Sequence, residues 1–269
     1  MNEKSDLGEL FDGVVVPEAT PSPRTIRFAT PPLGDGPSRV FDEAGAGDDP
    51  RVARIFGVTD EVTNVLVGPT FVAVTIQHPD HWESLLAPVL RAVTDAFADD
   101  DRPTARDADA PAVLTLGTDA RVVDAHEPRR LERAWIELGV LQAGDGEGLD
   151  RIVAASRDAE AARRQVASVL LADAEPVAAA RTWARLLVDP SRSVRRSVVD
   201  TVSDACRAEL RPLLEQALDD ADPWIRWRAL RGIAALGVTP SRAAVEALVT
   251  DPDFRVRLES TRALRDSGP

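Results

Sequence analysis

A 31-residue repeat in the C-terminal half constrains this chain more than any other feature of its sequence. Asp189, Asp220 and Asp251 lie 31 residues apart, and five residues after each of them an apolar residue is followed by arginine. These arginines are Arg195, Arg226 and Arg257. Apolar residues also recur six and two residues before each aspartate. A fixed period of this length is typical of stacked supersecondary units, which bury a continuous core between neighbours and present an extended surface.

Each repeat unit is expected to contain two helices. The first helix ends near the aspartate and the second starts near the apolar-arginine pair, because the apolar positions recur at helical spacing. Clear copies span about residues 180–268, and a worn copy precedes them at about residues 149–179. The worn copy keeps Asp158 and Arg164 but has Arg163 where the pattern requires an apolar residue. The pattern predicts an all-α solenoid within residues 112–269.

The N-terminal part has a different pattern, typical of strands with a few helices. Residues 25–29 alternate as a strand does. Residues 62–67 and 71–76 are rich in strand-forming residues and are joined by a short link with glycine, which predicts a hairpin. Asp49-Pro50 starts a helix that runs to about Phe56, because aspartate caps helices and proline fits their first turn.

The remaining N-terminal segments complete this domain. Residues 30–49 are rich in proline, glycine and aspartate, which predicts a loop around a short Val40-Phe41 segment. An amphipathic helix is expected from residue 81 to about residue 98. We therefore expect an α+β domain with a small antiparallel sheet at residues 14–98. A polar linker follows at residues 99–111, before the all-α part.

Charge is divided unevenly along the chain, which has a formal net charge of −13. Residues 1–180 hold 17 basic and 32 acidic residues, whereas residues 181–269 hold 15 and 13. Nucleic-acid-binding domains are normally clearly basic, so this balance disfavours a nucleic-acid partner. Lys4 is the only lysine, and aspartate outnumbers glutamate by 29 to 16. We interpret this as the acidic surface of a halophilic protein; codon bias alone is the alternative.

Targeting and redox features are also informative. No stretch approaches the ~18 apolar residues of a membrane-spanning helix. The first nine residues lack the apolar core of a signal peptide. We therefore expect a cytoplasmic protein without a membrane partner. The single cysteine, Cys206, excludes an intrachain disulfide and any multi-cysteine metal site within one chain.

Residues 149–268 resemble HEAT repeats, in the short HEAT-like variety of phycobilisome lyases. The resemblance rests on the three in-register copies of aspartate followed by a Val-Arg or Ile-Arg pair. In that family the aspartate and arginine are structural, because they cap helices and tie one unit to the next. The resemblance implies that each guanidinium has a carboxylate or helix-end carbonyl partner. The residues of this structural ladder would be Asp189, Arg195, Asp220, Arg226, Asp251 and Arg257.

Residues 14–98 resemble the Nfu/NifU N-terminal domain, an accessory domain of iron–sulfur scaffold proteins. Residues 20–28, TPSPRTIRF, are similar to the family's opening T-P-N-P-x-x-x-K-F run. Residues 51–75 are similar to its helix–strand–hairpin core, and residues 82–97 to its last helix. Ser22 and Gly57 depart from the family's usual residues at their positions.

The resemblance does not extend to the cluster-binding part of those scaffolds. They bind the iron–sulfur cluster through a Cys-x-x-Cys motif in a separate C-terminal domain, and this sequence contains no such motif. HEAT-like repeats occupy that place. The layout is similar to that of bacterial proteins described as conserved virulence factors. The resemblance therefore implies a relation to iron–sulfur assembly without a bound cluster.

Candidate sites for chemistry are few. His78, Asp80 and His81 gather at a strand-to-helix junction, where a metal site competes with a simpler interpretation. Because the turn is flexible and contains Pro79, we favour surface polar residues with Asp80 as a helix cap. No phosphate loop, dinucleotide fingerprint, nucleophile elbow or zinc-protease motif occurs. The sequence predicts no catalytic, cofactor-binding or metal site, and we expect that the protein is not an enzyme.

Partner contacts are expected on the second helices, which we expect to build the concave face of the solenoid. Trp224 and Trp227 flank Ile225, so one indole lies off the core stripe and is either exposed or packed on the next repeat. The candidate protein-binding residues are Arg196, Trp227, Arg228 and Arg231.

These features together predict a non-catalytic protein-binding adaptor or scaffold, accessory to iron–sulfur cluster assembly. Its expected partner is an iron–sulfur assembly factor or client protein. Two alternatives stay open. One is an enzyme with a HEAT-like fold, such as a lyase or a DNA glycosylase-like protein, and a deep pocket with an acid and an aromatic residue would favour it. The other is a purely structural two-domain protein.

Overall fold

The computed structural model describes residues 11, 13–34, 36–98, 127–144, 146–237 and 242–266. Contacts divide the chain into two compact units. Unit 1 consists of residues 1–117 together with residues 249–269, and unit 2 consists of residues 118–248. The predicted linker at residues 99–111 lies outside the described residues, so the predicted domain limits stay a prediction.

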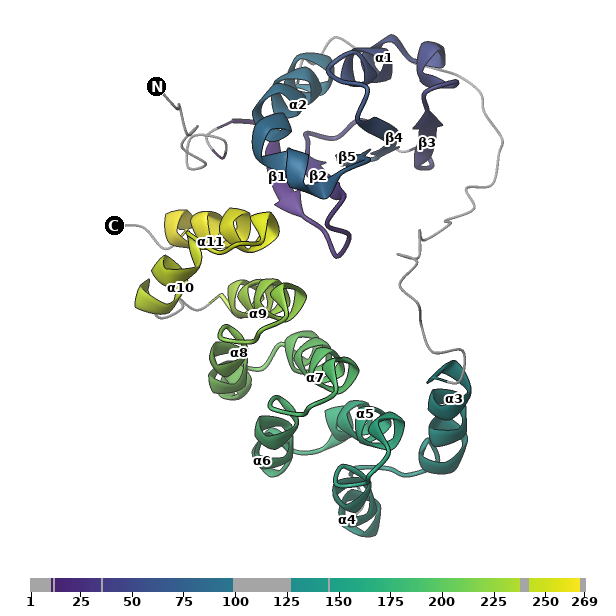
Figure 1. Ribbon diagram of the computed structural model, residues 1–269, viewed down its shortest axis with the longest axis vertical. Coiled ribbons are helices and arrows are strands. Elements are labelled where there is room, and N and C mark those ends of the chain that lie inside the picture. The colour runs from purple at the N-terminus through teal and green to yellow at the C-terminus, as the bar shows by residue number, and fades with distance from the viewer. Residues whose placement is uncertain are drawn as a thin grey trace. The chain divides into compact units, whose positions relative to one another are not determined.

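Unit 1 is built on a five-stranded antiparallel sheet with the strand order β1-β2-β5-β4-β3 (Figure 1). The strands are β1 (Val16–Ala19), β2 (Thr25–Ala29), β3 (Arg39–Asp42), β4 (Val62–Gly68) and β5 (Phe71–Ile76). The central strand β5 contributes fully buried side chains at Val72, Val74 and Ile76. Because alternate residues of a strand point to the same face, these three side chains lie on one face of the sheet, and this face packs against the core.

The predicted strand at residues 25–29 and the predicted hairpin are confirmed. Strand β3 is an addition to the prediction, because the sequence indicated only a short Val40-Phe41 segment within a loop. Phe41 is buried against the core while Val40 is exposed, so β3 is an edge strand with one covered face. A four-residue strand flanked by proline and glycine carries little periodicity, and its pairing with β4 is decided by tertiary contacts.

Helices α1 (Pro50–Phe56) and α2 (Trp82–Phe97) complete the core of the sheet domain. The carboxylate of Asp49 accepts a hydrogen bond from the backbone N–H of Arg51, which confirms the predicted cap. The indole N–H of Trp82, whose side chain is fully buried, donates to the carbonyl oxygen of Arg24 at 3.0 Å. The predicted cap at Asp80 is wrong, because α2 begins at Trp82 and no side chain caps it.

Helix α11 (Phe254–Asp266), the last of the repeat pattern, also belongs to unit 1 and lies against β1 (Figure 1). The guanidinium of Arg255 donates to the carbonyl oxygen of Pro21 at 3.0 Å. The guanidinium of Arg257 forms an ion pair with Glu83 of α2 at 3.1 Å. These polar contacts tie the end of the chain to the sheet domain within unit 1.

Unit 2 contains helices in two layers (Figure 1). Helices α3 (Glu127–Leu138), α5 (Ala161–Leu170), α7 (Arg192–Ala205) and α9 (Pro223–Ala235) are successive neighbours in one layer. Helices α4 (Gly146–Ala155), α6 (Pro176–Leu186) and α8 (Arg211–Ala217) form the other, and α10 (Arg242–Leu248) ends the unit. The predicted two helices per repeat are present, since α6 ends before Asp189 and α7 begins after it.

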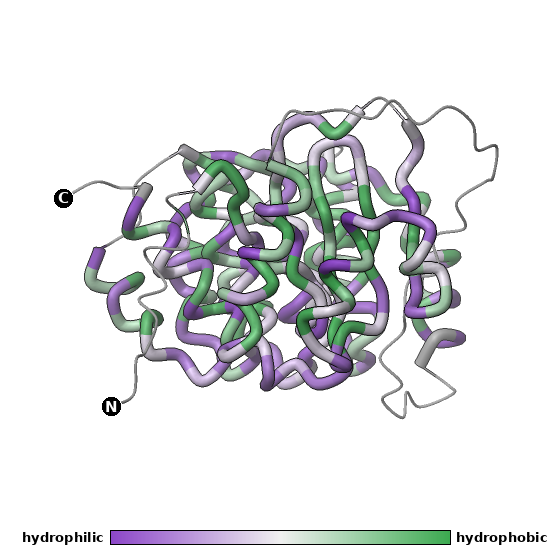
Figure 2. The backbone as a smooth tube through the Cα atoms, turned by 90° about the horizontal axis from the view of Figure 1, so that it is seen from above, coloured by the Kyte–Doolittle hydropathy of each residue, from purple (hydrophilic) through white to green (hydrophobic). Residues whose placement is uncertain are grey.

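The core of unit 2 follows the repeat positions. Val194 and Val198 of α7 and Ile225 and Ala229 of α9 have no exposed surface. The indole N–H of Trp183 donates to the carbonyl oxygen of Ser168 at 2.9 Å, so this buried polar group is satisfied. In Figure 2, hydrophobic and hydrophilic stretches alternate along the chain without a long apolar block. Within the described residues, no helix has the length and apolar character that crossing a membrane requires.

Candidate protein-binding surface

A ladder of arginine–aspartate pairs connects successive repeats. The guanidinium of Arg195 binds both carboxylate oxygens of Asp220, at 2.8 and 3.2 Å, across 25 residues of sequence. Arg164 binds Asp189 in the same way, at 2.7 and 2.8 Å. The worn repeat therefore keeps its polar connection, although its apolar position is occupied by Arg163.

Each ladder arginine also binds the turn of its own repeat. The Nη1 atoms of Arg195 and Arg226 donate to the carbonyl oxygens of Asp189 and Asp220, at 2.9 and 2.7 Å. Arg257 donates likewise to the carbonyl oxygen of its own aspartate, at 2.8 Å. Each guanidinium thus satisfies a carbonyl of the turn between two helices, and in Arg195 the same group also pairs with the carboxylate of the next repeat.

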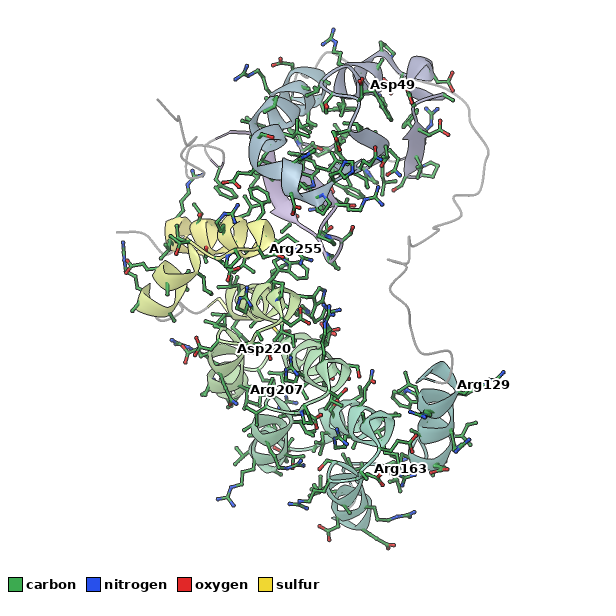
Figure 3. All side chains as sticks on the ribbon, in the orientation of Figure 1. Asp49, Arg129, Arg163, Arg207, Asp220 and Arg255 are labelled. Atoms are coloured by element: carbon green, nitrogen blue, oxygen red, sulfur yellow. The ribbon has the colours of Figure 1, made fainter. Side chains whose placement is uncertain are left out.

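The ladder aspartates close the turns between the two helices of each repeat. Asp189, Asp220 and Asp251 each accept a hydrogen bond at 2.8 Å from the backbone N–H two residues later. Figure 3 labels Asp220, in the turn between α8 and α9. Burial by itself would raise the pKa of Asp189, but hydrogen bonds from Arg164 and the backbone outweigh it and hold the pKa below its usual value.

A second set of ion pairs crosses between α7 and α9 at the start of α9. Arg192 and Arg196 both bind the carboxylate of Asp222, at 2.7 and 2.6 Å. This carboxylate also caps α9 by accepting from the backbone N–H of Trp224 at 3.1 Å. Burial would raise the pKa of Asp222, but the two guanidinium groups and the cap lower it to about 2.

Further ion pairs join the same two helices, and in these the arginine, Arg228, belongs to α9. Its guanidinium lies 2.7 Å from the carboxylate of Asp200 and 2.5 Å from that of Asp204, both on α7. The Arg196 guanidinium lies over the Trp224 ring, 5.0 Å from its centroid, and this ring is only half-buried. We call the following set the α7–α9 seam: Arg192, Arg196, Asp200, Asp204, Asp222, Trp224 and Arg228.

The seam changes the interpretation of the four candidate residues. Arg196 and Arg228 lie in it, but their guanidinium groups are already paired with carboxylates of neighbouring helices. Arg231 lies outside the seam, with its guanidinium 6.0 Å from the centroid of the Trp227 ring. Whether these residues bind a partner stays a prediction.

Trp227 is not at the surface, contrary to its prediction as a surface contact residue. Its side chain is 3% exposed, and its ring packs edge-on against that of Trp224, with the centroids 6.1 Å apart. Helix α9 buries residues on several sides, which a single core stripe through Ile225 does not describe. The exposed aromatic surface of the pair therefore belongs to Trp224.

One feature of the sequence indicates part of the seam. Asp222-Pro223 repeats the Asp-Pro helix start seen at Asp49-Pro50, so Asp222 was recognisable as a cap. Its two arginine partners were not recognisable, because they lie 26 and 30 residues earlier and reach it only through the stacking of the repeats.

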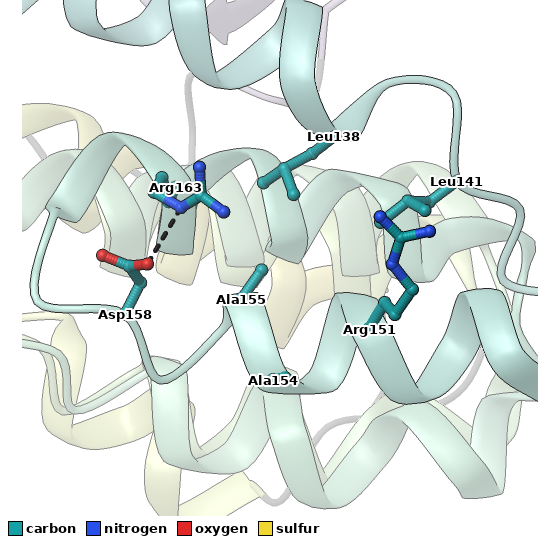
Figure 4. Close-up of a pocket in the computed structure, with 7 residues that line it drawn as sticks. All are labelled: Leu138, Leu141, Arg151, Ala154, Ala155, Asp158 and Arg163. Carbon is teal, nitrogen blue, oxygen red and sulfur yellow. Dashed lines mark ion pairs between the residues drawn. The ribbon is translucent and has the colours of Figure 1, made fainter.

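Two pockets in the described part of unit 2 bear on the enzyme alternative. The first, of ≈ 320 Å³, is lined by residues of α3, α4, α5 and the turns that follow α3 and α4, including the ion pair of Arg163 on α5 with Asp158 at 2.9 Å (Figure 4). The second, of ≈ 520 Å³, lies between the turns that hold Asp189 and Asp220. Neither pocket is lined by an aromatic residue. The acid–aromatic combination expected of a glycosylase-like site is therefore not found in these two pockets.

The fold and the ladder define the class of this protein as an α+β domain joined to a stack of paired α-helices. Both parts of the chain match known families. Residues 15–100 match the family of scaffold protein Nfu/NifU N-terminal domains, and residues 179–265 match HEAT repeats. The chain thus combines an Nfu/NifU-type N-terminal domain with HEAT repeats, and the predicted layout is confirmed. A search of the curated proteins found no match to the chain.

Replacing Asp222 with asparagine tests the electrostatics of the seam. We expect the free energy of unfolding at pH 7 to fall by about 2 kcal/mol, because a pKa lowered by nearly two units stabilises the folded state by ~1.4 kcal/mol per unit. The lowered pKa means that this stabilisation is complete above the unfolded value near 3.8 and is lost as the pH falls through about 2. Urea unfolding at several pH values measures both effects.

The matched control for this variant is Asp219→Asn, at an exposed aspartate of the same turn. It should change stability by less than about 0.5 kcal/mol. If the two variants lost equal stability, or if Asp222→Asn kept the wild-type decline of stability below pH 4, the paired state of Asp222 would be contradicted.

Proposed function

We propose that this protein is a non-catalytic adaptor, in which the HEAT repeats bind a protein partner and the Nfu/NifU-type domain connects that partner to iron–sulfur cluster assembly. The observation that carries the proposal is the fusion of these two domain types in one chain. The sequence holds one cysteine and no Cys-x-x-Cys motif. Under this proposal the chain recruits proteins that handle clusters and does not carry a cluster itself.

The α7–α9 seam supports a binding role for the layer of second helices. Trp224 is half-buried beside the fixed Arg196, and tryptophan and arginine are both enriched among the residues that dominate protein–protein binding energy. The carboxylate of Asp222 holds Arg196 in place before any partner arrives, so little side-chain freedom is lost on binding. Trp224 replaces Trp227 as the central residue of the proposed contact.

The charges of the seam indicate which partners fit. It pairs three arginines with three aspartates, and Asp200 and Asp204 are the more exposed members of their ion pairs with Arg228. A polyanion such as nucleic acid would be repelled by these carboxylates, and the guanidinium groups that could attract it are already paired. A protein with its own mixed charges and an apolar contact for Trp224 fits better, and we propose an iron–sulfur assembly factor or client protein.

The competing functions gain no support from the described residues. Neither of the two pockets described above is lined by the aromatic side chain that an enzyme of the glycosylase type was expected to place beside an acid. For the purely structural alternative, the absence of exposed tryptophan side chains would be support, but Trp135 on α3 is exposed.

The test is an affinity pull-down from cells of the source organism in high salt, followed by titration calorimetry with the purified partner. We expect iron–sulfur assembly or client proteins among the recovered proteins. Trp224→Ala should weaken the measured affinity by at least tenfold, about 1.4 kcal/mol, as for a central interface residue.

The matched control is Val177→Ala, which trims an exposed apolar side chain on α6, in the other layer. This variant should bind as the wild type does. Equal weakening by both variants, or full binding by Trp224→Ala, would show that the partner does not use the seam. Recovery of specific partners unrelated to iron–sulfur proteins would reject the proposed connection to cluster assembly.

A further inference from the structure

A cluster of side chains able to bind a metal ion lies in unit 1. Glu61 directly precedes β4, and His78 and His81 follow β5, in the 3-10 turn that leads into α2. Strands β4 and β5 pair antiparallel with Val62 opposite Ile76, so the start of one and the end of the other meet at the same place. The backbone N–H of Gln77 donates to the carbonyl oxygen of Glu61 at 2.8 Å, which extends this pairing by one residue.

The three side chains converge on one point. The Nδ1 atom of His78 lies 2.9 and 3.1 Å from the two carboxylate oxygens of Glu61, and the Nδ1 atom of His81 lies 3.1 Å from one of them. One ligand atom from each residue can be chosen so that all three lie within 4.8 Å of one another. The imidazole rings are tilted by 49°, with their centroids 5.3 Å apart.

These separations fit the coordination of one metal ion. Zinc binds histidine nitrogen and carboxylate oxygen at about 2.0–2.2 Å, which places two tetrahedral ligands about 3.3 Å apart. The observed nitrogen–oxygen separations of 2.9–3.1 Å need to widen by only a few tenths of an ångström. The backbone positions are held by the strand pairing, so the ligands need no large rearrangement to bind an ion.

The exposure of the cluster is also suitable. The side chains of His78 and His81 are 57% and 53% exposed, and that of Glu61 is 23% exposed. Three protein ligands with an open outer side leave coordination positions for water or for a ligand from another molecule.

We propose that Glu61, His78 and His81 bind a divalent first-row transition metal ion of the zinc type. Two imidazoles and one carboxylate are ligands that such ions accept, whereas magnesium and calcium prefer sites made of oxygen alone. The site lies in the Nfu/NifU-type domain and uses neither the HEAT repeats nor the seam, so its test does not depend on the partner-binding surface proposed above. It also differs from the site weighed from the sequence, because Glu61 takes the place of Asp80.

The difference between Glu61 and Asp80 provides a sharp test. Asp80 is exposed, lies between the two histidines in sequence, and is not part of the cluster. Tag-free full-length protein is titrated with Zn²⁺ by calorimetry in KCl buffer, and with Co²⁺ by visible absorption, which reports the coordination geometry. We expect one equivalent of ion per chain for the wild type and for Asp80→Asn.

Glu61→Gln and His78→Ala should each weaken the affinity for Zn²⁺ at least roughly tenfold, because loss of a ligand costs more than loss of its outer hydrogen bonds. Circular dichroism checks that the variants keep their secondary structure. Absence of binding to the wild type would overturn the proposal. Unchanged affinity in Glu61→Gln, or weakening by Asp80→Asn as large as that by Glu61→Gln, would overturn the assigned ligands.

Discussion

Trp82→Ala should lower the free energy of unfolding of the sheet domain by about 3–5 kcal/mol, as removal of a fully buried aromatic side chain does. The indole fills the space between α2 and the sheet, where its ring lies 6.4 Å from that of Phe28. Its N–H also bonds the carbonyl oxygen of Arg24, next to the β2–β5 ladder. Urea unfolding followed by circular dichroism measures the loss, and hydrogen exchange of residues 62–97 assigns it to unit 1.

Trp82→Phe separates the packing of the indole from its hydrogen bond. The carbonyl oxygen of Arg24 also accepts the backbone N–H of Ile76 at 2.9 Å, so it stays satisfied when the indole is lost. We therefore expect the phenylalanine variant to lose much less stability, about 1–2 kcal/mol. Equal losses in both variants would show that the hydrogen bond and not the buried volume dominates.

Arg195→Met should lower the free energy of unfolding of the repeats by about 2–4 kcal/mol. The variant removes the guanidinium that binds both Asp220 and the carbonyl oxygen of Asp189, and it leaves a carboxylate that is only 7% exposed without its partner. Breaking a buried pair from one side costs about 3–5 kcal/mol, and the 16% exposure of the Arg195 side chain reduces this somewhat. Urea unfolding followed by tryptophan fluorescence reports the change, since Trp183 and Trp227 lie in unit 2.

Two further variants isolate the ladder contribution. Arg242→Met breaks an exposed pair with Glu246 four residues along α10 and should cost less than about 0.5 kcal/mol. Arg195→Met combined with Asp220→Asn should recover part of the loss, because asparagine removes the unpaired charge and still accepts from the backbone N–H of Asp222. A cost in Arg242→Met equal to that in Arg195→Met, or no recovery in the double variant, would contradict a ladder that stabilises through buried charge pairing.

Local sequence signals predicted the regular elements well. The helix at Pro50–Phe56 and the strand at Thr25–Ala29 have the predicted bounds, because a cap, a proline and a short alternation act within a few residues. The 31-residue period likewise predicted the paired helices of the repeats, which comparison with HEAT repeats supports. These features are local or strictly periodic, so neighbouring residues are sufficient to specify them.

Local sequence patterns gave wrong or incomplete predictions where the neighbours of a residue come from distant parts of the chain. Trp227 was named as a candidate contact residue because only the face of α9 that contains Ile225 was counted as covered, whereas several faces are buried. Glu61 was missed as a partner of His78, although a hairpin brings the residue before its first strand close to the residues after its second strand. The pairing of Arg228 with Asp200 and Asp204 joins different helices and had no local signal.

The sequence by itself indicated an α+β part followed by repeated pairs of helices, because these follow from short-range chemistry or from a repeated spacing. The resemblance to known families implied the two domain types and the arginine–aspartate ladder. Only the tertiary structure decided which charges are already paired, which tryptophan is accessible, and that Glu61 joins two histidines. Those properties depend on burial and on distances between residues tens of positions apart. Strand pairing and helix stacking set these distances, and a linear pattern does not contain them.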